Sequence, residues 1–239
     1  MSNNELRTHS RSPGPAQSQN CQAIKAKEVI LFDLDGTLTD PKAGITKSVA
    51  YALDSFGIKT EDLDDLCCFI GPPLKDSFMN FCAFSEADAV RAIEKYREYF
   101  KDTGLFENEL YAGIDSMLQR LSAAGRQLVV ATSKPKIFAD RILEHFKIAH
   151  YFKVVCGSEL DGTRTKKSEV IRYALEKAGI TDVNKAIMVG DREHDVIGAN
   201  DVGIPCIGVL YGYGSREEFE KAGAALIVES VEELGEALL

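Results

Sequence analysis

The sequence lacks the long apolar run of a membrane-spanning helix, because no segment reaches about 18 consecutive apolar residues. It also lacks a basic excess, since 28 lysines and arginines stand against 37 aspartates and glutamates, giving a net charge of -9. This balance argues against binding a nucleic acid polymer, although an acidic protein can still bind an anion in a local positive pocket. We therefore expect a soluble cytoplasmic protein with no membrane and no nucleic acid polymer as partner.

Cysteine motifs are absent as well. No Cys-x-x-Cys pair and no cluster with the four histidines occurs among the six cysteines, Cys21, Cys67, Cys68, Cys82, Cys156 and Cys206. Neither a disulfide framework nor a zinc site is indicated. We interpret the cysteines as small residues of a reduced protein.

Residues 1–26 lack any apolar stretch and are rich in Ser, Asn, Gln, Arg and Pro. Such a segment cannot be a secretory signal and cannot pack a core, so we predict a disordered N-terminal tail. The whole chain has 239 residues, of which 45% are apolar. It can therefore bury a large core, as one domain or as a core with an insertion.

The apolar run 29–32, Val-Ile-Leu-Phe, is followed by two carboxylates one residue apart. A short run without a polar break is typical of a strand covered on both faces, so we place it at the centre of a parallel sheet. Asp33 and Asp35 then lie at its carboxyl end, where ligands bind in open α/β sheets. Gly36 is the small residue that lets the chain turn away there.

Acids two residues apart on an extended chain lie on the same side and repel each other unless a cation or a proton is present. A hard divalent ion such as Mg2+ suits Asp33 and Asp35 better than a soft metal. A turn closed by aspartates is the alternative, because Asp-x-Asp-Gly is common in loops. The preceding apolar strand and the following Thr-Leu favour the metal site.

Residues 41–110 read as helical throughout. The last of these segments, 85–101, opens with Ser85 and Asp88 as a capping pair and carries one stripe formed by Val90, Ile93, Arg97 and Phe100. From residue 111 onward, short apolar strands alternate with helices. We therefore predict an α/β fold, a Rossmann-like doubly wound parallel sheet formed by residues 27–40 and 111–239, with an inserted helical cap at 41–110.

Four segments resemble, in order, the four signatures of the haloacid dehalogenase superfamily, in its phosphatase branch. They are Asp33-Leu34-Asp35-Gly36-Thr37-Leu38, the strand 128–133 that ends in Thr132 and Ser133, Lys167 or else Lys166, and the strand 187–195 that contains Gly190-Asp191 and Asp195. Together they cover residues 28–210. The helical insertion resembles the small cap of one subclass of this superfamily.

The resemblance implies a phosphatase with Mg2+ bound by a carboxylate oxygen of Asp33, the backbone carbonyl of Asp35 and the side chain of Asp191. Asp33 would attack phosphorus and form an aspartyl-phosphate. Asp35 would protonate the leaving alcohol and then activate the hydrolytic water. Asp195 would position the lysine or a metal-bound water.

Thr132 and Lys167 would, by the same resemblance, hold the non-bridging phosphate oxygens, with Gly36 and Ser133 as further phosphate-binding candidates. The local sequence leaves alternatives open. Thr132 could instead cap the next helix, and a lysine at a polar helix start is usually a solvated surface charge. Asp195 could be a helix N-terminal acid, and we treat His194 as a surface residue.

The cap decides the substrate. Residues 71–75 resemble the specificity loop of phosphoglycolate phosphatase-like members, and Lys75 or Arg97 could meet a polar substrate tail, although both could equally face solvent. Residues 157–164 are similar to members known as 5'-nucleotidases. The expected partner is a small phosphorylated metabolite, phosphoglycolate or a nucleoside 5'-monophosphate, and the expected assembly is a monomer or homodimer.

Two other functions remain open at this point. A mutase of the same superfamily would return the phosphoryl group to a sugar phosphate. A catalytically silent protein would use the cap cleft to sense a metabolite, but it would be expected to lack an acid or the lysine, and none is missing. A dehalogenase is disfavoured, because that chemistry has no use for Asp35.

Overall fold

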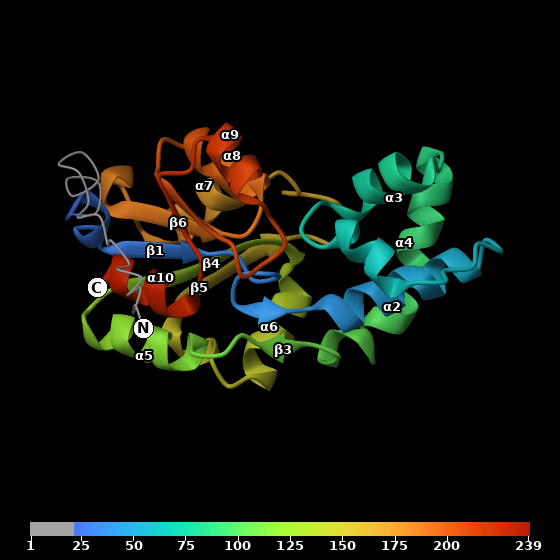
Figure 1. The fold of residues 1–239 in the computed structure, drawn as a ribbon, viewed down its shortest axis with the longest axis horizontal. Coiled ribbons are helices and arrows are strands. Elements are labelled where there is room, and N and C mark those ends of the chain that lie inside the picture. The colour runs from blue at the N-terminus through green and yellow to red at the C-terminus, as the bar shows by residue number, and fades with distance from the viewer. Residues whose placement is uncertain (1–21) are drawn as a thin grey trace, which may run out of the picture.

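The structure, a computed structural model, describes residues 22–239. Its core is a parallel sheet of six strands in the order β5-β4-β1-β6-β7-β8 (Figure 1). The strands are β1 (Val29–Phe32), β4 (Gln127–Pro135), β5 (Phe152–Ser158), β6 (Ala186–Gly190), β7 (Cys206–Val209) and β8 (Leu226–Val228). The predicted doubly wound parallel sheet is confirmed, and β1 lies inside it with β4 and β6 as neighbours.

Both faces of the sheet are covered, which explains the unbroken apolar run of β1. Ile30 and Phe32 pack on one face, and Val29 and Leu31 pack on the other. The first face is covered by α5 (Ile114–Ala123), α6 (Lys136–His145) and α10 (Val231–Leu238). The second is covered by α7 (Lys167–Ala178), α8 (Glu193–Asn200) and α9 (Arg216–Ala222). Two short 3-10 helices, η3 (Ala149–Tyr151) and η4 (Val183–Lys185), precede β5 and β6.

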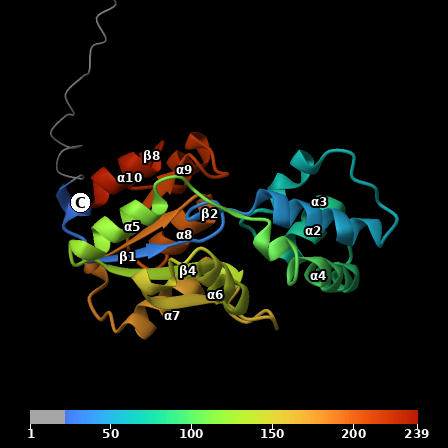
Figure 2. The ribbon, with the colours of Figure 1, turned by 90° about the horizontal axis from the view of Figure 1, so that it is seen from below.

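The inserted helices form a lobe beside the sheet (Figure 2). The lobe contains α2 (Lys42–Asp54), η1 (Leu63–Phe69), α3 (Leu74–Cys82), α4 (Glu86–Phe100) and η2 (Gly104–Phe106). The chain enters and leaves it through β2 (Thr39–Asp40) and β3 (Glu109–Leu110), which pair antiparallel. The prediction of helix up to residue 110 is therefore wrong at its end, because the two crossings run side by side and satisfy each other's backbone groups.

The predicted disordered tail does not extend to residue 26. Residues 22–25 are helical, and Ile24 packs in the core with 2% of its surface exposed. Burial of Ile24 and hydrogen bonds from Arg126 to the carbonyls of Lys25 and Lys27 hold this turn against the domain. The rest of the predicted tail, residues 1–21, lies outside the described residues. Within residues 22–239, no helix is both long and apolar enough to span a bilayer.

The stripe predicted on α4 coincides only at Phe100 with the face that is buried in the lobe. Ala89, Ala92, Tyr96 and Phe100 are buried there, whereas Val90 is 45% exposed. Ser85 does cap the helix, since its hydroxyl accepts a hydrogen bond from the Asp88 amide. The stripe residues do lie on one face of α4, but whether that face is buried depends on the neighbouring elements of the fold.

Candidate active site

The functional residues gather at the carboxyl edge of the sheet, beside the central strand. The chain leaves β1 toward β4 and leaves β6 toward β7, so the connections diverge in opposite directions between these two strands. Such a switch point opens a crevice for ligands. Asp33 directly follows β1, and its backbone amide donates to the carbonyl of Val189 in β6, 2.9 Å away. Asp191 directly follows β6.

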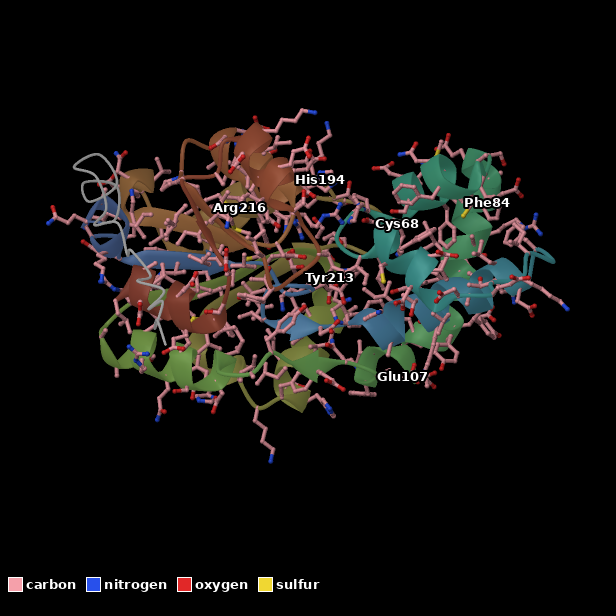
Figure 3. The ribbon with its side chains drawn as sticks, viewed as in Figure 1. Cys68, Phe84, Glu107, His194, Tyr213 and Arg216 are labelled. Atoms are coloured by element: carbon pink, nitrogen blue, oxygen red, sulfur yellow. The ribbon has the colours of Figure 1, made fainter. Side chains whose placement is uncertain are left out.

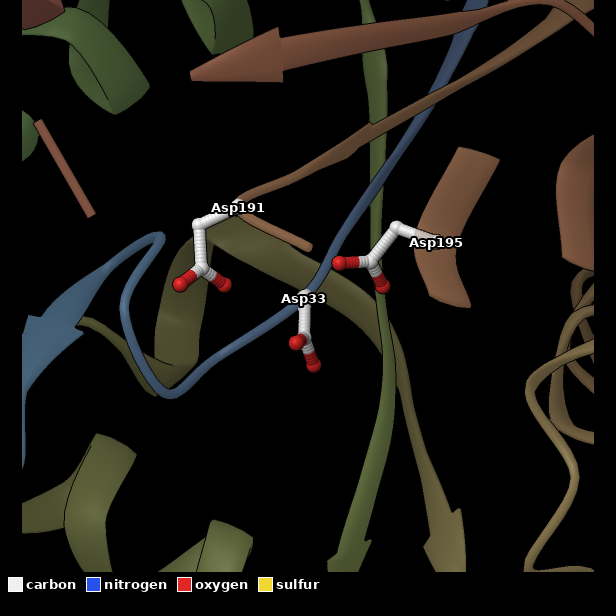
Figure 4. Close-up of side chains that lie close together, drawn as sticks. All are labelled: Asp33, Asp191 and Asp195. Atoms are coloured by element: carbon white, nitrogen blue, oxygen red, sulfur yellow. The ribbon is translucent and has the colours of Figure 1, made fainter. Parts of the chain in front are cut away.

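Three carboxylates meet in this crevice. Each of Asp33, Asp191 and Asp195 offers an oxygen, and these oxygens all lie within 4.8 Å of one another (Figure 4). All three side chains are buried, with at most 4% of the residue exposed. Residues 158 positions apart in the sequence thus form one acidic cluster, which is able to hold a metal ion.

Lys167 supplies positive charge to the cluster from the first turn of α7. Its Nζ lies 2.9 Å from Asp33 Oδ1 and 2.8 Å from Asp195 Oδ1, and it donates to the carbonyl of Ala131. Burial lowers the pKa of Lys167, but the charges of Asp195 and Asp33 outweigh burial and raise it above its usual value. Lys166, by contrast, is exposed. The structure therefore brings Lys167, and not Lys166, to the carboxylates.

The acids themselves are held in an environment that disfavours negative charge. Burial raises the pKa of Asp191 well above its usual value, and the charges of Asp195 and Asp33 raise it further. Burial also raises the pKa of Asp195, to about 6, against the opposing charge of Lys167. One lysine does not neutralise three carboxylates, so the cluster favours binding a cation or a proton.

Asp191 is fixed by the backbone around it. Its two oxygens accept hydrogen bonds from the Thr37 hydroxyl and from the Tyr213 amide, at 3.3 and 3.0 Å. Gly36 has a φ of +80°, and a Cβ there would lie 2.0 Å from Asp191 Oδ2. A Cβ on Gly212 would lie 2.4 Å from Asp191 Cβ. Gly36 therefore serves close packing, and no contact of it with the cleft is found in the described chain.

Asp35 does not join the three carboxylates but forms its own buried pair. Its Oδ2 lies 2.6 Å from Nζ of Lys134, and both side chains are nearly enclosed. The same ammonium lies 4.6 Å from the ring centre of Phe100 in the helical lobe. Burial raises the pKa of Asp35, only partly opposed by Lys134. Lys134 thus connects the acid to the lobe.

Thr132 and Ser133 lie near the end of β4. The Thr132 hydroxyl is buried and accepts a hydrogen bond from the Lys134 amide at 3.2 Å. It does not cap α6, which follows Pro135 without a side-chain cap, so that alternative is wrong. Ser133 lines a cleft between the lobe and the core.

A cleft of about 930 Å³ separates the lobe from the core and reaches Asp35 and Lys167. All four residues of the stripe predicted on α4 line it from the lobe side, and Phe100 is in addition buried in the core. From the core side it is lined by residues of the segments 133–135, 158–162 and 165–168 and by His194. Figure 3 places His194 where the core faces the lobe.

Both cap residues predicted to meet the substrate line this cleft, but each already has a partner. Lys75 forms an ion pair with Glu86 inside the lobe. Arg97 donates to the carbonyl of Leu160 in the core at 3.1 Å. In the opposite direction, Arg192 of the core donates to the carbonyl of Ile70 in the lobe at 2.8 Å. Each of these arginines thus hydrogen-bonds the backbone across the boundary between lobe and core, as does Arg141 of α6 with the carbonyl of Lys101.

A family model described as haloacid dehalogenase-like hydrolase matches residues 30–209. The chain belongs to this family. Among curated relatives, a 5'-nucleotidase of Pseudomonas aeruginosa is 52% identical over 189 residues, covering 79% of this chain and 85% of that protein. The tyrosine-protein kinase PtkA of Mycobacterium tuberculosis is 36% identical, covering 90% and 73%. A phosphoglycolate phosphatase of Agrobacterium fabrum is 32% identical, covering 77% and 80%.

Solved structures of haloacid dehalogenase-like proteins have the same fold. A predicted phosphatase from Clostridium acetobutylicum is 55% identical, with a TM-score of 0.86 over 87% of this chain and 96% of its own. The predicted family and the enzyme class, a phosphoric monoester hydrolase, are thereby confirmed.

Several residues around this haloacid dehalogenase-like site were missed by the sequence analysis. Lys134 is the most important, and its position directly after Thr132 and Ser133 at a strand end was a usable signal. The Gly212-Tyr213-Gly214 loop gave another, because paired glycines after a strand often indicate close backbone approach. In this loop the backbone approaches Asp191.

Proposed function

We propose that the chain is a Mg2+-dependent phosphatase that hydrolyses a small phosphomonoester through an aspartyl-phosphate on Asp33. The observation that carries the proposal is the group of three buried carboxylates beside Lys167, which itself lines the cleft. That arrangement combines a nucleophile, a phosphate-binding cation and a metal site. The predicted cytoplasmic location and the predicted monomer or homodimer remain predictions.

The residues fit a hard divalent cation. Oxygens of Asp33, Asp191 and Asp195 lie within 4.8 Å of one another, and Lys167, which contacts one oxygen each of Asp33 and Asp195, is the only cation paired with them among the described residues. The backbone carbonyl of Asp35 accepts no backbone hydrogen bond in the described part of the chain. Mg2+ prefers such oxygens and keeps some of its waters. We assign Asp33, Asp191 and the Asp35 carbonyl as its ligands; when bound, the ion offsets the negative charge of the phosphate.

The protein's own groups would then carry the reaction. One oxygen of Asp33 attacks phosphorus, and the bond from phosphorus to the ester oxygen breaks. Asp35 donates its proton to the departing alkoxide and becomes a carboxylate, which Lys134 stabilises. In the second half, Asp35 takes a proton from water as the water attacks phosphorus. The bond between phosphorus and the Asp33 oxygen then breaks, which frees Asp33 and releases inorganic phosphate.

Charge on the non-bridging oxygens would be met by Lys167, with the Thr132 hydroxyl beside it. Asp195 keeps that ammonium in place, since the two groups are 2.8 Å apart and both buried. Because Lys167 is preorganised, little energy is spent on ordering it during the reaction.

The size of the cleft favours a nucleoside 5'-monophosphate over phosphoglycolate. Ligand sites commonly have roughly 300 to 1,000 Å³, and this one, at about 930 Å³, lies at the upper end. Three residues at its boundary, Val90, Leu160 and Ile197, are each at least 44% exposed and apolar. Such a rim suits a flat, partly apolar base. The high identity to a 5'-nucleotidase supports the same substrate class.

A panel of phosphorylated metabolites tests the proposal. Purified protein is expected to release inorganic phosphate with Mg2+ and to lose at least about 90% of that activity with a chelator. Nucleoside 5'-monophosphates are expected to give a higher kcat/KM than phosphoglycolate or hexose phosphates. Transfer of the phosphoryl group to an added sugar phosphate would indicate a mutase, and binding without turnover would indicate a silent sensor.

Replacing the proposed acid should produce a defect that depends on the leaving group. Asp35→Asn is expected to lower kcat/KM, which reports the step in which the leaving group departs, by about 10²- to 10⁴-fold on an alkyl phosphate, the usual contribution of a positioned acid. The loss should be smaller on p-nitrophenyl phosphate, whose leaving group needs no proton. Because burial raises the pKa of Asp35, the wild type should lose activity on alkyl esters as pH rises through that pKa. Equal losses on both esters would contradict the assignment.

A further inference from the structure

Tyr96 of α4 lines the same cleft as Asp35 but has no role so far. Only 4% of its surface is exposed, and it is among the residues that bound the cleft. A buried tyrosine usually satisfies its hydroxyl with a hydrogen bond. Among residues 22–239, however, no group hydrogen-bonds the Tyr96 hydroxyl. Its oxygen is not one of the sealed polar atoms without a partner, so it keeps access to the cleft.

The ring of Tyr96 is held firmly, which fixes where its hydroxyl lies. It stacks on Phe100 one helical turn later, with ring centres 5.1 Å apart and an angle of 20° between the planes. Phe100 in turn contacts Phe138 of the core edge to face, at 5.3 Å. Nζ of Lys134 also lies against Phe100, 4.6 Å from its ring centre. The aromatic chain therefore ties Tyr96 to the core beside the Lys134 and Asp35 pair.

The charge of Asp35 reaches the phenol. Burial raises the pKa of Tyr96 well above its usual value, and the negative charge of Asp35 raises it further. The hydroxyl is therefore protonated and available as a donor at any working pH. The proposed site of the phosphoryl group is beside Lys167 and the three carboxylates. The Tyr96 hydroxyl instead lies on the side of the proposed acid Asp35, where the leaving group of a substrate would be.

We propose that the Tyr96 hydroxyl donates a hydrogen bond to an oxygen of the leaving group, close to the ester oxygen that Asp35 protonates. This inference rests on the proposed phosphatase function and adds a substrate class to it: esters of oxygen-rich alcohols, such as the ribose of a nucleotide. Esters without a second oxygen near the ester bond gain nothing from Tyr96. Tyr96 is thus a specificity-determining residue contributed by the lobe.

Tyr96→Phe tests this with the least disturbance, because it removes only the hydroxyl and keeps the stacking on Phe100. The selectivity, defined as kcat/KM for a nucleoside 5'-monophosphate divided by kcat/KM for phenyl phosphate, is expected to fall about tenfold, the effect of one hydrogen bond. Tyr99→Phe is the matched control on the same helix. Its hydroxyl bonds Glu107, and Tyr99 does not line the cleft, so its selectivity should equal the wild type's.

A binding measurement separates this inference from the proposed function. In the Asp33→Asn background, calorimetry should show that Tyr96→Phe weakens the nucleoside 5'-monophosphate about tenfold relative to inorganic phosphate. An unchanged selectivity together with unchanged relative binding would overturn the role of Tyr96 and leave the phosphatase proposal standing. Absence of turnover by the wild type would refute the phosphatase proposal. The affinities for the nucleoside 5'-monophosphate and for inorganic phosphate would still test whether Tyr96 contacts the leaving group. Failure of every phosphoester to bind would overturn both.

Discussion

Asp33→Asn is expected to reduce phosphatase turnover by at least about 10⁴-fold, equivalent to about 5.5 kcal/mol of transition-state stabilisation. The amide cannot form the aspartyl-phosphate, and no other carboxylate of the cluster is placed to substitute. Asp191 is held by Thr37 and Tyr213, and Asp195 faces Lys167. Steady-state release of phosphate measures the loss. Acid quench and intact mass spectrometry should show a phosphorylated wild type and an unmodified variant.

The fold should survive this substitution. Asn is nearly isosteric with Asp, and Lys167 keeps Asp195 as a partner at 2.8 Å. Removing one of three buried like charges also reduces repulsion in the metal-free protein, so the Tm should stay equal or rise slightly. Asp54→Asn, on an exposed position of α2, is the control and should have wild-type turnover. Turnover by Asp33→Asn within tenfold of the wild type would refute the nucleophile.

The sheet could be predicted because its signals are local. Each strand is a short apolar run, each following helix has its own periodicity, and β1 has no polar residue because it is covered on both faces. Alternation of strands and helices then leaves few topologies.

The parts that could not be predicted depend on contacts between distant segments. The pairing of Lys134 with Asp35 requires the ends of β4 and β1 to lie side by side, which no local pattern encodes. The antiparallel pairing of β2 and β3 joins residues about seventy positions apart. On α4 the periodicity predicted one stripe, but only Phe100 of that stripe is fully buried, because a cleft lies beside its residues.

The choice between Lys166 and Lys167 was open in the sequence and is decided by how α7 packs on α8. At Gly198 of α8, a Cβ would lie 2.8 Å from the Cβ and Cγ of Lys167. The glycine therefore lets the two helices approach and turns Lys167 inward, while Lys166 stays exposed. A lone lysine at a helix start carries no sign of this contact, because the deciding residue is a glycine on another helix.

Lys167→Met is the second substitution with a large expected effect, and here both stability and activity should fall. Methionine fills similar space but leaves Asp33 and Asp195 without their cation. Removing one member of a buried ion pair commonly costs about 3 to 5 kcal/mol, and the metal-free variant should lose stability on this scale in urea unfolding. Turnover should drop by about 10²- to 10³-fold, as for other fixed groups that stabilise transition-state charge.

Lys166→Met is the matched control, since it removes an identical side chain one residue away. As an exposed change it should alter stability by no more than about 0.5 kcal/mol. Mg2+ should restore part of the stability of Lys167→Met, because a cation that binds only the folded state stabilises it. If Lys167→Met kept wild-type stability while Lys166→Met lost stability, the roles assigned to the two lysines would be reversed.

The deficit of Lys167→Met should also depend on pH with a defined sign. In the wild type the pKa of Asp195 is raised to about 6, and losing Lys167 should raise it further. A carboxyl whose pKa is raised in the folded state favours folding when protonated, and this contribution is lost as pH rises through that pKa. The stability gap between Lys167→Met and the wild type should therefore widen above pH 6 and narrow below it. A gap that is constant over this range would mean that Lys167 contributes packing alone and does not balance the charge of the carboxylates.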